Sequence, residues 1–333
     1  MPFVYDDLAE ICRNKDNLIA WLREKELLGD FSGPCLKCLK GHFTFRRDKS
    51  YSNDGVLWRC SNSKCTNKVS IREGSWFSGS HLQLEQVIKL TYYWVYKLPL
   101  DFIARELKIG SEHTIVDWCQ FARDVCIGII KTDNEQIGGP GVEIEIDESK
   151  FGKRKYHRGK RVDGVWVFGG VERRSKKCFF EIVEERSAAR LIPIIKRYVK
   201  PGSIILSDCW KAYNSLEDEG YTHLTVNHSI EFKNKETGAC TNLIESTWNA
   251  VKKSLPKYGT QKQLYDSYLV EYCIRKKYLN DADDKFLKFL ELIKRVYPGK
   301  KVRQPLTDIS NDAECSSASD SAANSSLVDL FDD

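Results

Sequence analysis

The segment VEIEID at residues 142–147 decides the fold, together with VWVFGGV at 165–171 and CFFEIV at 178–183. Apolar residues alternate or cluster within each segment and short gaps separate the three, which is typical of an antiparallel meander of β-strands. The chain continues with elements expected as a helix at 188–199, strands at 203–208 and 224–228, and a helix at 242–255. Strands followed by a mixture of strands and helices indicate an α/β fold.

Three acidic residues lie in these elements, two at the ends of strands and one in a helix. Asp147 ends the first strand, Asp208 ends the fourth, and Glu245 lies in the last helix. The order βββαβαβα is that of a ribonuclease H-like fold, in which the first and fourth strands lie side by side. We therefore expect Asp147 and Asp208 to project into one cleft, with Glu245 close by. Glu148 is an alternative to Asp147, and Glu145 shares its face of the strand, but Asp147 is preferred because it ends the apolar alternation.

Three converging carboxylates repel one another unless divalent cations lie between them. Mg²⁺ is a hard cation and prefers such oxygen ligands. Two ions about 3.5–4 Å apart can activate an attacking oxygen and stabilise a leaving oxygen on phosphorus. The sequence therefore predicts a site for cleavage or exchange of phosphodiester bonds, with Mg²⁺ held by Asp147, Asp208 and Glu245.

Four of the twelve cysteines form two close pairs, Cys35 with Cys38 and Cys60 with Cys65. Two such pairs complete the tetrahedral coordination of Zn²⁺, and four thiolates leave no open position for catalysis. The sequence between the pairs alternates like short strands, so we expect a structural zinc ribbon that needs its metal to fold. His42 is an alternative ligand because the second pair is widely spaced. The scattered cysteines are expected to be reduced thiols, since the N-terminus carries no secretory signal.

Helical periodicity is expected before the ribbon, at 4–28. Three helices are expected after the ribbon, at 82–96, at 100–107 and from Ser111 onward. A helix, a short turn containing glycine and another helix are typical of a DNA-binding helix-turn-helix, although many three-helix bundles share this pattern. If the segment reads DNA, the residues nearest the base edges are Ser111, Glu112, His113 and Thr114.

The formal net charge of +5 is unevenly distributed along the chain. Residues 304–333 carry seven acids and no Lys or Arg, so residues 1–303 carry +12. A basic body indicates a polyanionic partner, most often nucleic acid, and the Ser- and Ala-rich tail is expected to be disordered. No stretch is long and apolar enough to cross a bilayer, so we expect no membrane association.

A basic segment, KFGKRKYHRGKR at 150–161, lies between the first two strands, and seven of its twelve residues are Lys or Arg. We expect this hairpin to bind DNA phosphates, and the alternative is a solvated turn. The residues expected to contact DNA are Lys153, Arg154, Lys155, Arg158, Lys160 and Arg161.

Four segments of the chain resemble the Merlin superfamily of DDE transposases, the eukaryotic counterpart of bacterial insertion sequences with the same transposase domain. They are EIDESKF at 145–151, LSDCWKAY at 206–213, VNHS at 226–229 and TGACTNLIESTW at 237–248. The resemblance extends over about residues 30–285 and includes the ribbon and the helical segment.

The resemblance implies that Asp147, Asp208 and Glu245 are the DDE acids and that Mg²⁺ or Mn²⁺ is the cofactor. It also implies that the N-terminal half recognises the terminal inverted repeats of a mobile element. His228 and Asn242 match positions near the site of the family, where they orient DNA or a metal-bound water. Members usually carry His at the position of Cys240, and the change would weaken activity if that His assists catalysis or binds phosphate. All three acids are present, so we expect a competent enzyme.

We expect five segments along the chain: N-terminal helices at 1–30, a zinc ribbon at 31–78, a helix-turn-helix at 80–135, a ribonuclease H-like DDE transposase domain at 141–300 and an acidic tail at 304–333. The expected activity is cut-and-paste transposition, in which hydrolysis at the element's end precedes attack of the freed 3′-hydroxyl on target DNA. The partner is double-stranded DNA, and synapsis of two ends implies a homodimer or a higher oligomer.

Two alternatives stay open at this point. One is a domesticated, transposase-derived regulator that binds DNA without cutting it, and the other is a nuclease that cuts without joining. Basic runs at 275–277 and 300–301 predict nuclear localisation.

Overall fold

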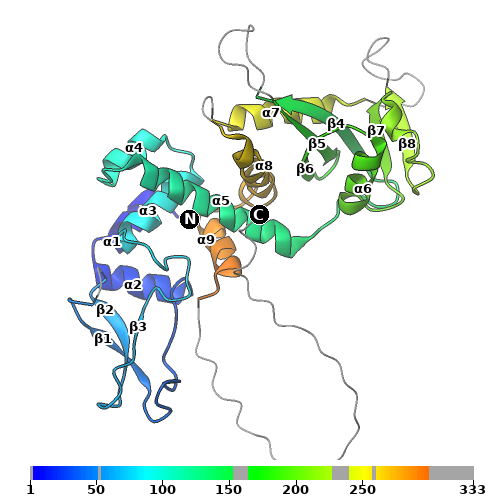
Figure 1. Ribbon diagram of the computed structural model, residues 1–333. Helices are drawn as coiled ribbons and strands as arrows, with labels where there is room; N and C mark the ends of the chain where they lie inside the picture. The colour runs from blue at the N-terminus through cyan, green and yellow to red at the C-terminus, as the bar shows by residue number, and fades with distance from the viewer. Residues whose placement is uncertain (1–2, 52–53, 153–163, 227–239, 257–259, 300–333) are drawn as a thin grey trace, which may run out of the picture.

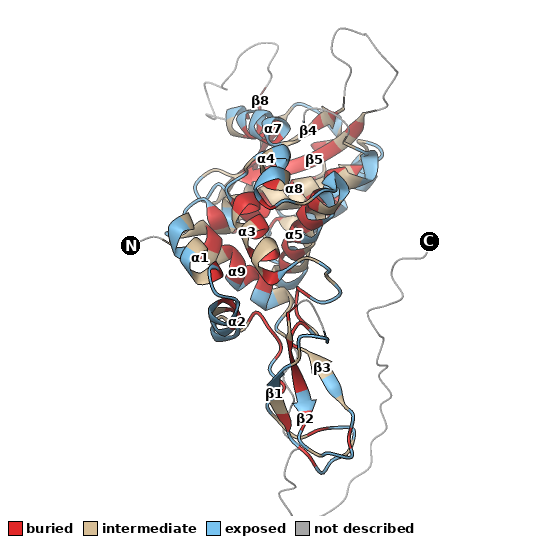
Figure 2. Cartoon of the chain, turned by 90° about the vertical axis from the view of Figure 1, so that its left-hand side faces the viewer, coloured by how far each residue is buried: buried red, intermediate tan, exposed pale blue. Residues whose placement is uncertain are grey.

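The structure is a computed structural model that describes residues 3–51, 54–152, 164–226, 240–256 and 260–299. A five-stranded sheet lies at one end of the molecule and a three-stranded sheet at the other, with a group of helices between them (Figure 1). Figure 2 shows this arrangement from the side, with buried residues concentrated in the helices and the larger sheet. No helix in these ranges is long and apolar enough to cross a membrane.

The larger sheet has the strand order β6-β5-β4-β7-β8. β4 (Glu143–Phe151), β5 (Val165–Glu172) and β6 (Cys178–Val183) form an antiparallel meander. β7 (Ile204–Asp208) and β8 (Thr222–Val226) extend the sheet from β4 in parallel. This is the topology of a ribonuclease H-like fold, so the predicted fold class is confirmed, including the adjacency of the first and fourth strands.

Helices cover both faces of this sheet. α6 (Ala188–Tyr198) covers one face, where Ile144 and Ile146 of β4 belong to its hydrophobic core. α7 (Asn242–Ser254) and α8 (Tyr265–Ile274) cover the other face. Because side chains alternate along a strand, Glu143, Glu145 and Asp147 of β4 point to the opposite face, toward α7.

The N-terminal periodic segment forms two helices rather than one. α1 (Tyr5–Cys12) ends shortly before Asn14, and α2 (Lys15–Glu24) begins directly after it. The side-chain oxygen of Asn14 accepts hydrogen bonds from the backbone N–H groups of Asp16 and Asn17, at 2.8 and 3.4 Å. Asparagine is among the strongest N-cap residues, so it starts a new helix inside a continuous apolar pattern.

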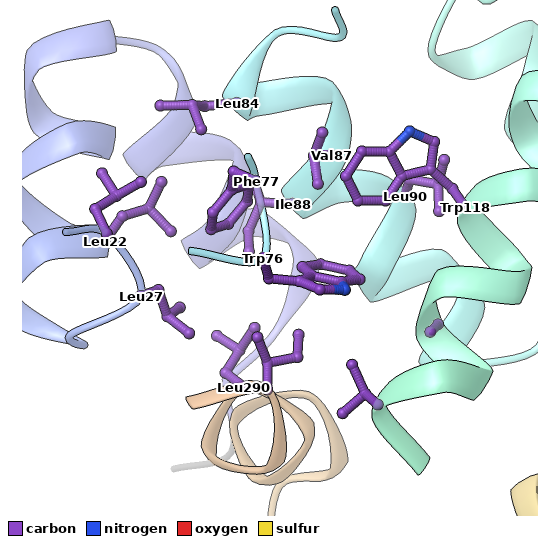
Figure 3. Close-up of a cluster of buried hydrophobic side chains, with 14 of the residues drawn as sticks. Leu22, Leu27, Trp76, Phe77, Leu84, Val87, Ile88, Leu90, Trp118 and Leu290 are labelled. Atoms are coloured by element: carbon purple, nitrogen blue, oxygen red, sulfur yellow. The ribbon is translucent and has the colours of Figure 1, made fainter. Parts of the chain in front are cut away.

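The expected helix-turn-helix segment forms α3 (Leu84–Val95), α4 (Leu100–Glu106) and α5 (Glu112–Asp133). Their hydrophobic core also includes α9 (Lys285–Val296), a helix from the far end of the described chain. Figure 3 shows Leu290 of α9 among side chains from the N-terminal helices and the segment before α3. The division of the chain at residue 141 stays a prediction, but this core joins residues from both sides of that position.

A π-helical turn, Arg275–Leu279, connects α8, which covers the large sheet, to α9, which belongs to the N-terminal core. Arg275 is 7% exposed and donates hydrogen bonds to the carbonyl oxygens of Trp94 and Val95, at 2.9 Å each. Its guanidinium also forms an ion pair with Glu271 at 2.7 Å. The basic run at 275–277 therefore begins with a buried side chain that an import receptor could not bind in the folded chain.

Candidate active site and metal centre

The register between β4 and β7 brings the first two predicted acids to the same level of the sheet. Glu145 pairs with Leu206 in the parallel ladder, and Asp147 and Asp208 follow two residues later on their strands. Since Ile144 and its partner Ile205 both point to the α6 face, the two aspartates both point to the opposite face, which α7 covers. Two carboxylates thus lie side by side on adjacent parallel strands, with Asp208 at the end of β7 and Asp147 in the middle of β4 rather than at its end as predicted.

The third predicted acid, Glu245, lies in the first turn of α7, and it is exposed. The hydroxyl of Thr241 lies 3.5 Å from its carboxylate and donates to it. Asn242, predicted to assist, is the exposed first residue of the same helix. The first turn of α7 therefore carries both of these predicted residues.

Alternate residues of β4 contact successive turns of α7. The carboxylate of Glu145 accepts hydrogen bonds from the backbone N–H groups of Leu243 and Ile244, at 2.8 and 2.9 Å. The indole N–H of Trp248 donates to Asp147 at 2.9 Å. One further contact, from the ammonium group of Lys252 to Ser149, measures 2.6 Å. These polar contacts fix the position of α7, and hence of Glu245, relative to Asp147.

Gly169 makes room for the contact between Trp248 and Asp147. It pairs with Asp147 across β4 and β5, and a Cβ atom at this position would lie 2.7 Å from the Trp248 ring and 2.5 Å from Phe180. Trp248 itself is 4% exposed and packs against Phe151 and Phe180. Its hydrogen bond to Asp147 could not be predicted from the sequence, because it joins β4 to a residue 101 positions away.

Burial raises the pKa of Asp147 to about 6, and the charges of Asp208 and Glu245 act in the same direction, while the Trp248 hydrogen bond opposes the rise. The pKa of Glu148 is raised to about 7, again mainly by burial. A carboxyl group that resists ionisation, with other acids around it, is common at functional sites and favourable for a cation. The three predicted acids therefore share one electrostatic environment.

Glu148, the alternative to Asp147, points to the other face of the sheet. Its partner across the ladder is Phe168, in the core under α6, and the hydroxyl of Tyr213 donates to its carboxylate. Asp147 shares its face with Asp208, whereas Glu148 does not. The geometry thus favours Asp147 as the residue that faces α7.

The three carboxylates match the chemistry of a hard divalent cation, since each offers oxygen ligands. Their ligand atoms do not all lie within 4.8 Å of one another. In the part of the chain that the structure describes, only the four cysteines Cys35, Cys38, Cys60 and Cys65 bring three or more ligand atoms that close. A pair of ions about 3.5–4 Å apart needs a wider set of ligands than a single ion does. The donor chemistry of the three residues fits Mg²⁺ or Mn²⁺, since all three are carboxylates and Glu245 is exposed.

Glu145 is 1% exposed, and its charge is balanced by Arg173 at 2.8 Å. The same guanidinium donates to the carbonyl oxygen and to the sulfur of Cys240, at 2.9 Å each, just before α7. It also forms an ion pair with Glu143 at 3.1 Å. Cys240 thus takes part in the network that holds the start of α7. The sequence offered no signal for Arg173, because its importance depends on a contact across the sheet.

The four paired cysteines converge at the base of the small sheet, which consists of β1 (Phe43–Arg47), β2 (Val56–Cys60) and β3 (Lys68–Ser70). Sulfur–sulfur distances are 3.8 Å for Cys35 and Cys65 and 3.6 Å for Cys38 and Cys60. With zinc–sulfur bonds of about 2.3 Å, a tetrahedral site requires sulfurs about 3.8 Å apart.

Neighbouring groups support a metal-binding role for these sulfurs. The backbone N–H of Lys40 lowers the pKa of Cys38 to about 6, which favours the thiolate that zinc requires, while burial raises the pKa of Cys60 to about 12. The side-chain amide of Asn67 donates to the sulfur of Cys35 at 3.5 Å. A Cβ atom at Gly41 would lie 2.5 Å from the sulfur of Cys60, so the turn needs glycine. His42, the alternative ligand, is exposed and does not belong to the cluster. These four cysteines could hold Zn²⁺ with no open position.

The start of α5 presents the residues expected to read DNA. Glu112 and His113 are exposed, and Thr114 is partly buried. Val116 and Phe121, on the next turns, are 46% and 45% exposed. Base reading by this helix stays a prediction.

Several predictions concern residues outside the described ranges. They are the six basic residues expected to contact DNA (Lys153, Arg154, Lys155, Arg158, Lys160 and Arg161), the auxiliary residue His228 and the acidic tail at 304–333.

Comparison with known proteins gives two kinds of similarity. The model of the ISXO2-like transposase domain matches residues 127–279. A segment of 96 residues is 34% identical to an uncharacterized transposase-like protein of Haemophilus influenzae and spans 28% of this chain and 76% of that protein.

Among solved structures, the chain is similar to the catalytic core of the HTLV-2 integrase in complex with magnesium, with 12% identity and a TM-score of 0.29 over 45% of this chain and 93% of that one. It is also similar to a chain of the simian T-cell lymphotropic virus intasome, with 14% identity and a TM-score of 0.32 over 70% of this chain and 80% of that one. At such TM-scores the fold assignment depends on the strand order described above.

Proposed function

We propose that this chain, which belongs to the family of transposases with an ISXO2-like domain, cuts DNA at the ends of a mobile element and joins the freed ends to new DNA. Metal-dependent hydrolysis and strand transfer form the two steps of this cut-and-paste reaction. The finer assignment to the Merlin superfamily is part of the proposal and rests on the four segments that resemble it.

The register of β4 and β7 is the observation that carries the proposal, because it aligns Asp147 with Asp208 on the face that α7 covers. In this proposal, Asp147, Asp208 and Glu245 hold Mg²⁺ or Mn²⁺. When bound, the metal activates the attacking oxygen and stabilises the leaving oxygen on phosphorus.

The remaining roles belong to the protein itself. Trp248 donates to one carboxylate oxygen of Asp147 and so helps to hold this side chain in place. Glu145 holds the first turn of α7, which keeps Glu245 near the two aspartates. Such positioning matters because a reacting group displaced by about 1 Å loses much of its effect.

The N-terminal half of the chain binds the terminal inverted repeats in this proposal, through the helix-turn-helix and a ribbon stabilised by Zn²⁺. The basic hairpin at 150–161 binds phosphates near the cut, and synapsis of two ends requires a homodimer or a higher oligomer. Nuclear localisation stays a prediction that depends on Lys300 and Lys301, which lie outside the described residues.

The test is incubation of the full chain with Mg²⁺ and linear DNA that carries the inverted repeats flanking its gene. We expect Asp147→Asn, Asp208→Asn and Glu245→Gln each to abolish cleavage while DNA binding persists. Glu148→Gln is the matched control, because it neutralises the adjacent acid on the other face and should retain most of the activity.

Each other outcome identifies a different function. Binding of the ends without any nick by the unaltered chain would identify a DNA-binding regulator. Cleavage without joining would identify a nuclease, and full strand transfer by one of the three variants would remove that acid from the site.

A further inference from the structure

An aromatic and cationic cluster lies at the edge of the large sheet where β7 ends at Asp208, and the strand residues of this cluster lie on the α6 face. The ends of β4, β6 and β7 and the start of β5 all meet at this edge, because β4 and β7 are parallel and β5 is antiparallel to its neighbours. The cluster consists of Lys150, Trp166, Arg186 and Trp210.

The guanidinium of Arg186 lies over two indole rings in this cluster. Its central carbon is 4.0 Å from the ring centroid of Trp166 and 5.2 Å from that of Trp210. The ammonium group of Lys150 lies 5.5 Å from the Trp166 centroid. These distances are within the range of cation–π attraction, so the rings and the cations hold one another in place.

Trp210 is 42% exposed, which is unusual for the largest apolar side chain. Its backbone N–H donates to the carboxylate of Asp208 at 3.0 Å, and its indole N–H donates to the carbonyl oxygen of Arg186 at 3.4 Å. The exposed ring is therefore tied to a predicted metal ligand and cannot turn away freely.

We propose that Trp210, supported by Arg186 and Trp166, stacks on an unpaired nucleobase at the end of the DNA substrate. The proposal rests on the proposed function in one respect, which is that the ligand is DNA. Aromatic rings beside cations are the surface that binds single-stranded nucleic acid, because every base has a face that can stack and every nucleotide carries a phosphate. An unpaired base held here would lie next to Asp208, whose carboxylate accepts from the backbone of Trp210.

The experiment measures the affinity of the full chain for two labelled duplexes, one blunt and one with a few unpaired nucleotides at its end, by fluorescence anisotropy without added Mg²⁺ or Mn²⁺. The unaltered chain should bind the unpaired end more tightly. Trp210→Leu should reduce this preference by roughly 5- to 150-fold, the range that corresponds to one stacked base, and leave binding of the blunt duplex within about twofold.

Two further variants separate stacking from other effects. Trp210→Phe keeps a ring and should retain most of the preference, whereas Arg186→Lys removes the planar group under the ring and should lose part of it. Val4→Ala is the control, because Val4 is similarly exposed, at 49%, and precedes α1, outside the helix-turn-helix and the ribbon.

The proposal is overturned if the unaltered chain shows no preference, if Trp210→Leu keeps it, or if that variant loses both duplexes equally. Because no divalent metal is added, the preference is independent of cleavage. A chain that prefers unpaired ends and never cuts them would keep the stacking site and refute the proposed function.

Discussion

Replacement of Glu145 by Gln should destabilise the protein and loosen the start of α7. The buried carboxylate receives two backbone N–H bonds and one Arg173 bond. Hydrogen bonds to a charged group contribute about 1.5–3 kcal/mol each and neutral ones about 0.5–1.5 kcal/mol. Glutamine can still accept from the helix, but its amide N–H₂ would face Arg173, which has no acceptor.

The free energy of unfolding should fall by about 2–4 kcal/mol. This is somewhat less than the usual effect of removing one partner of a buried ion pair, because Arg173 retains Glu143 and the carbonyl oxygen of Cys240 as partners. Urea denaturation of the full chain measures this loss. Hydrogen exchange of the Leu243 and Ile244 amides measures the loosening directly, since these are the two groups that Glu145 accepts from.

Glu143→Gln is the matched control for this prediction. Glu143 lies on the same strand and pairs with the same Arg173, but its side chain is 44% exposed against 2% for that of Glu145. Exposed ion pairs contribute about 0–1 kcal/mol, so this variant should have little effect. Equal losses for the two variants, or a loss below about 0.5 kcal/mol for Glu145→Gln with unchanged exchange, would refute the reasoning.

Three other predictions follow from the sites described above. Trp248→Phe keeps the packing but removes the donor to Asp147. The rate of cleavage should therefore fall about tenfold or more, and the Mg²⁺ concentration that gives half the maximal rate should rise. Equal kinetics for the variant and the unaltered chain would contradict this. Because the folded pKa of Asp147, about 6, exceeds its unfolded value, its protonation stabilises the metal-free fold below about pH 4, and this contribution is lost as the pH rises through 6. Titration with Mn²⁺ should accordingly show weaker binding below pH 6, and Asp147→Asn should flatten the pH dependence of stability. Cys38→Ser should release zinc, measured by elemental analysis, and unfold the ribbon but not the large sheet, whereas Cys209→Ser, at an exposed thiol outside the cluster, should keep the metal.

The sheet was predictable because its strands carry strong local signals. Alternation identified β4, β5 and β6, and the uncharged run before Asp208 identified β7. β4 continues to Phe151, beyond the predicted end at Asp147, because its last residues pair with β5. Pairing across strands is a long-range effect that periodicity cannot show.

The helices at the two ends of the chain were harder to predict. Asn14 divides the first periodic segment through a cap, a local signal that the pattern of apolar residues concealed. α9 joins the N-terminal core through Phe286 and Leu290, a contact between distant parts of the chain. Nothing in the local sequence specifies which core such an amphipathic helix completes.

The residues of the site also divide into those that the sequence identified and those that only the structure reveals. The acids Asp147, Asp208 and Glu245 stood out in the sequence because charge interrupts or follows an apolar pattern. The residues that position them, Glu145 and Arg173, could not be distinguished from surface charges until their burial was known.

Diffraction from crystals of the full chain soaked in Mn²⁺, with the anomalous signal of the metal, tests the central claim most directly. The account predicts density between Asp147 and Asp208 on the face covered by α7, with Glu245 turned in to complete the ligands. Metal bound only at Glu148, or a Glu245 that stays in solvent while the aspartates are occupied, would contradict it.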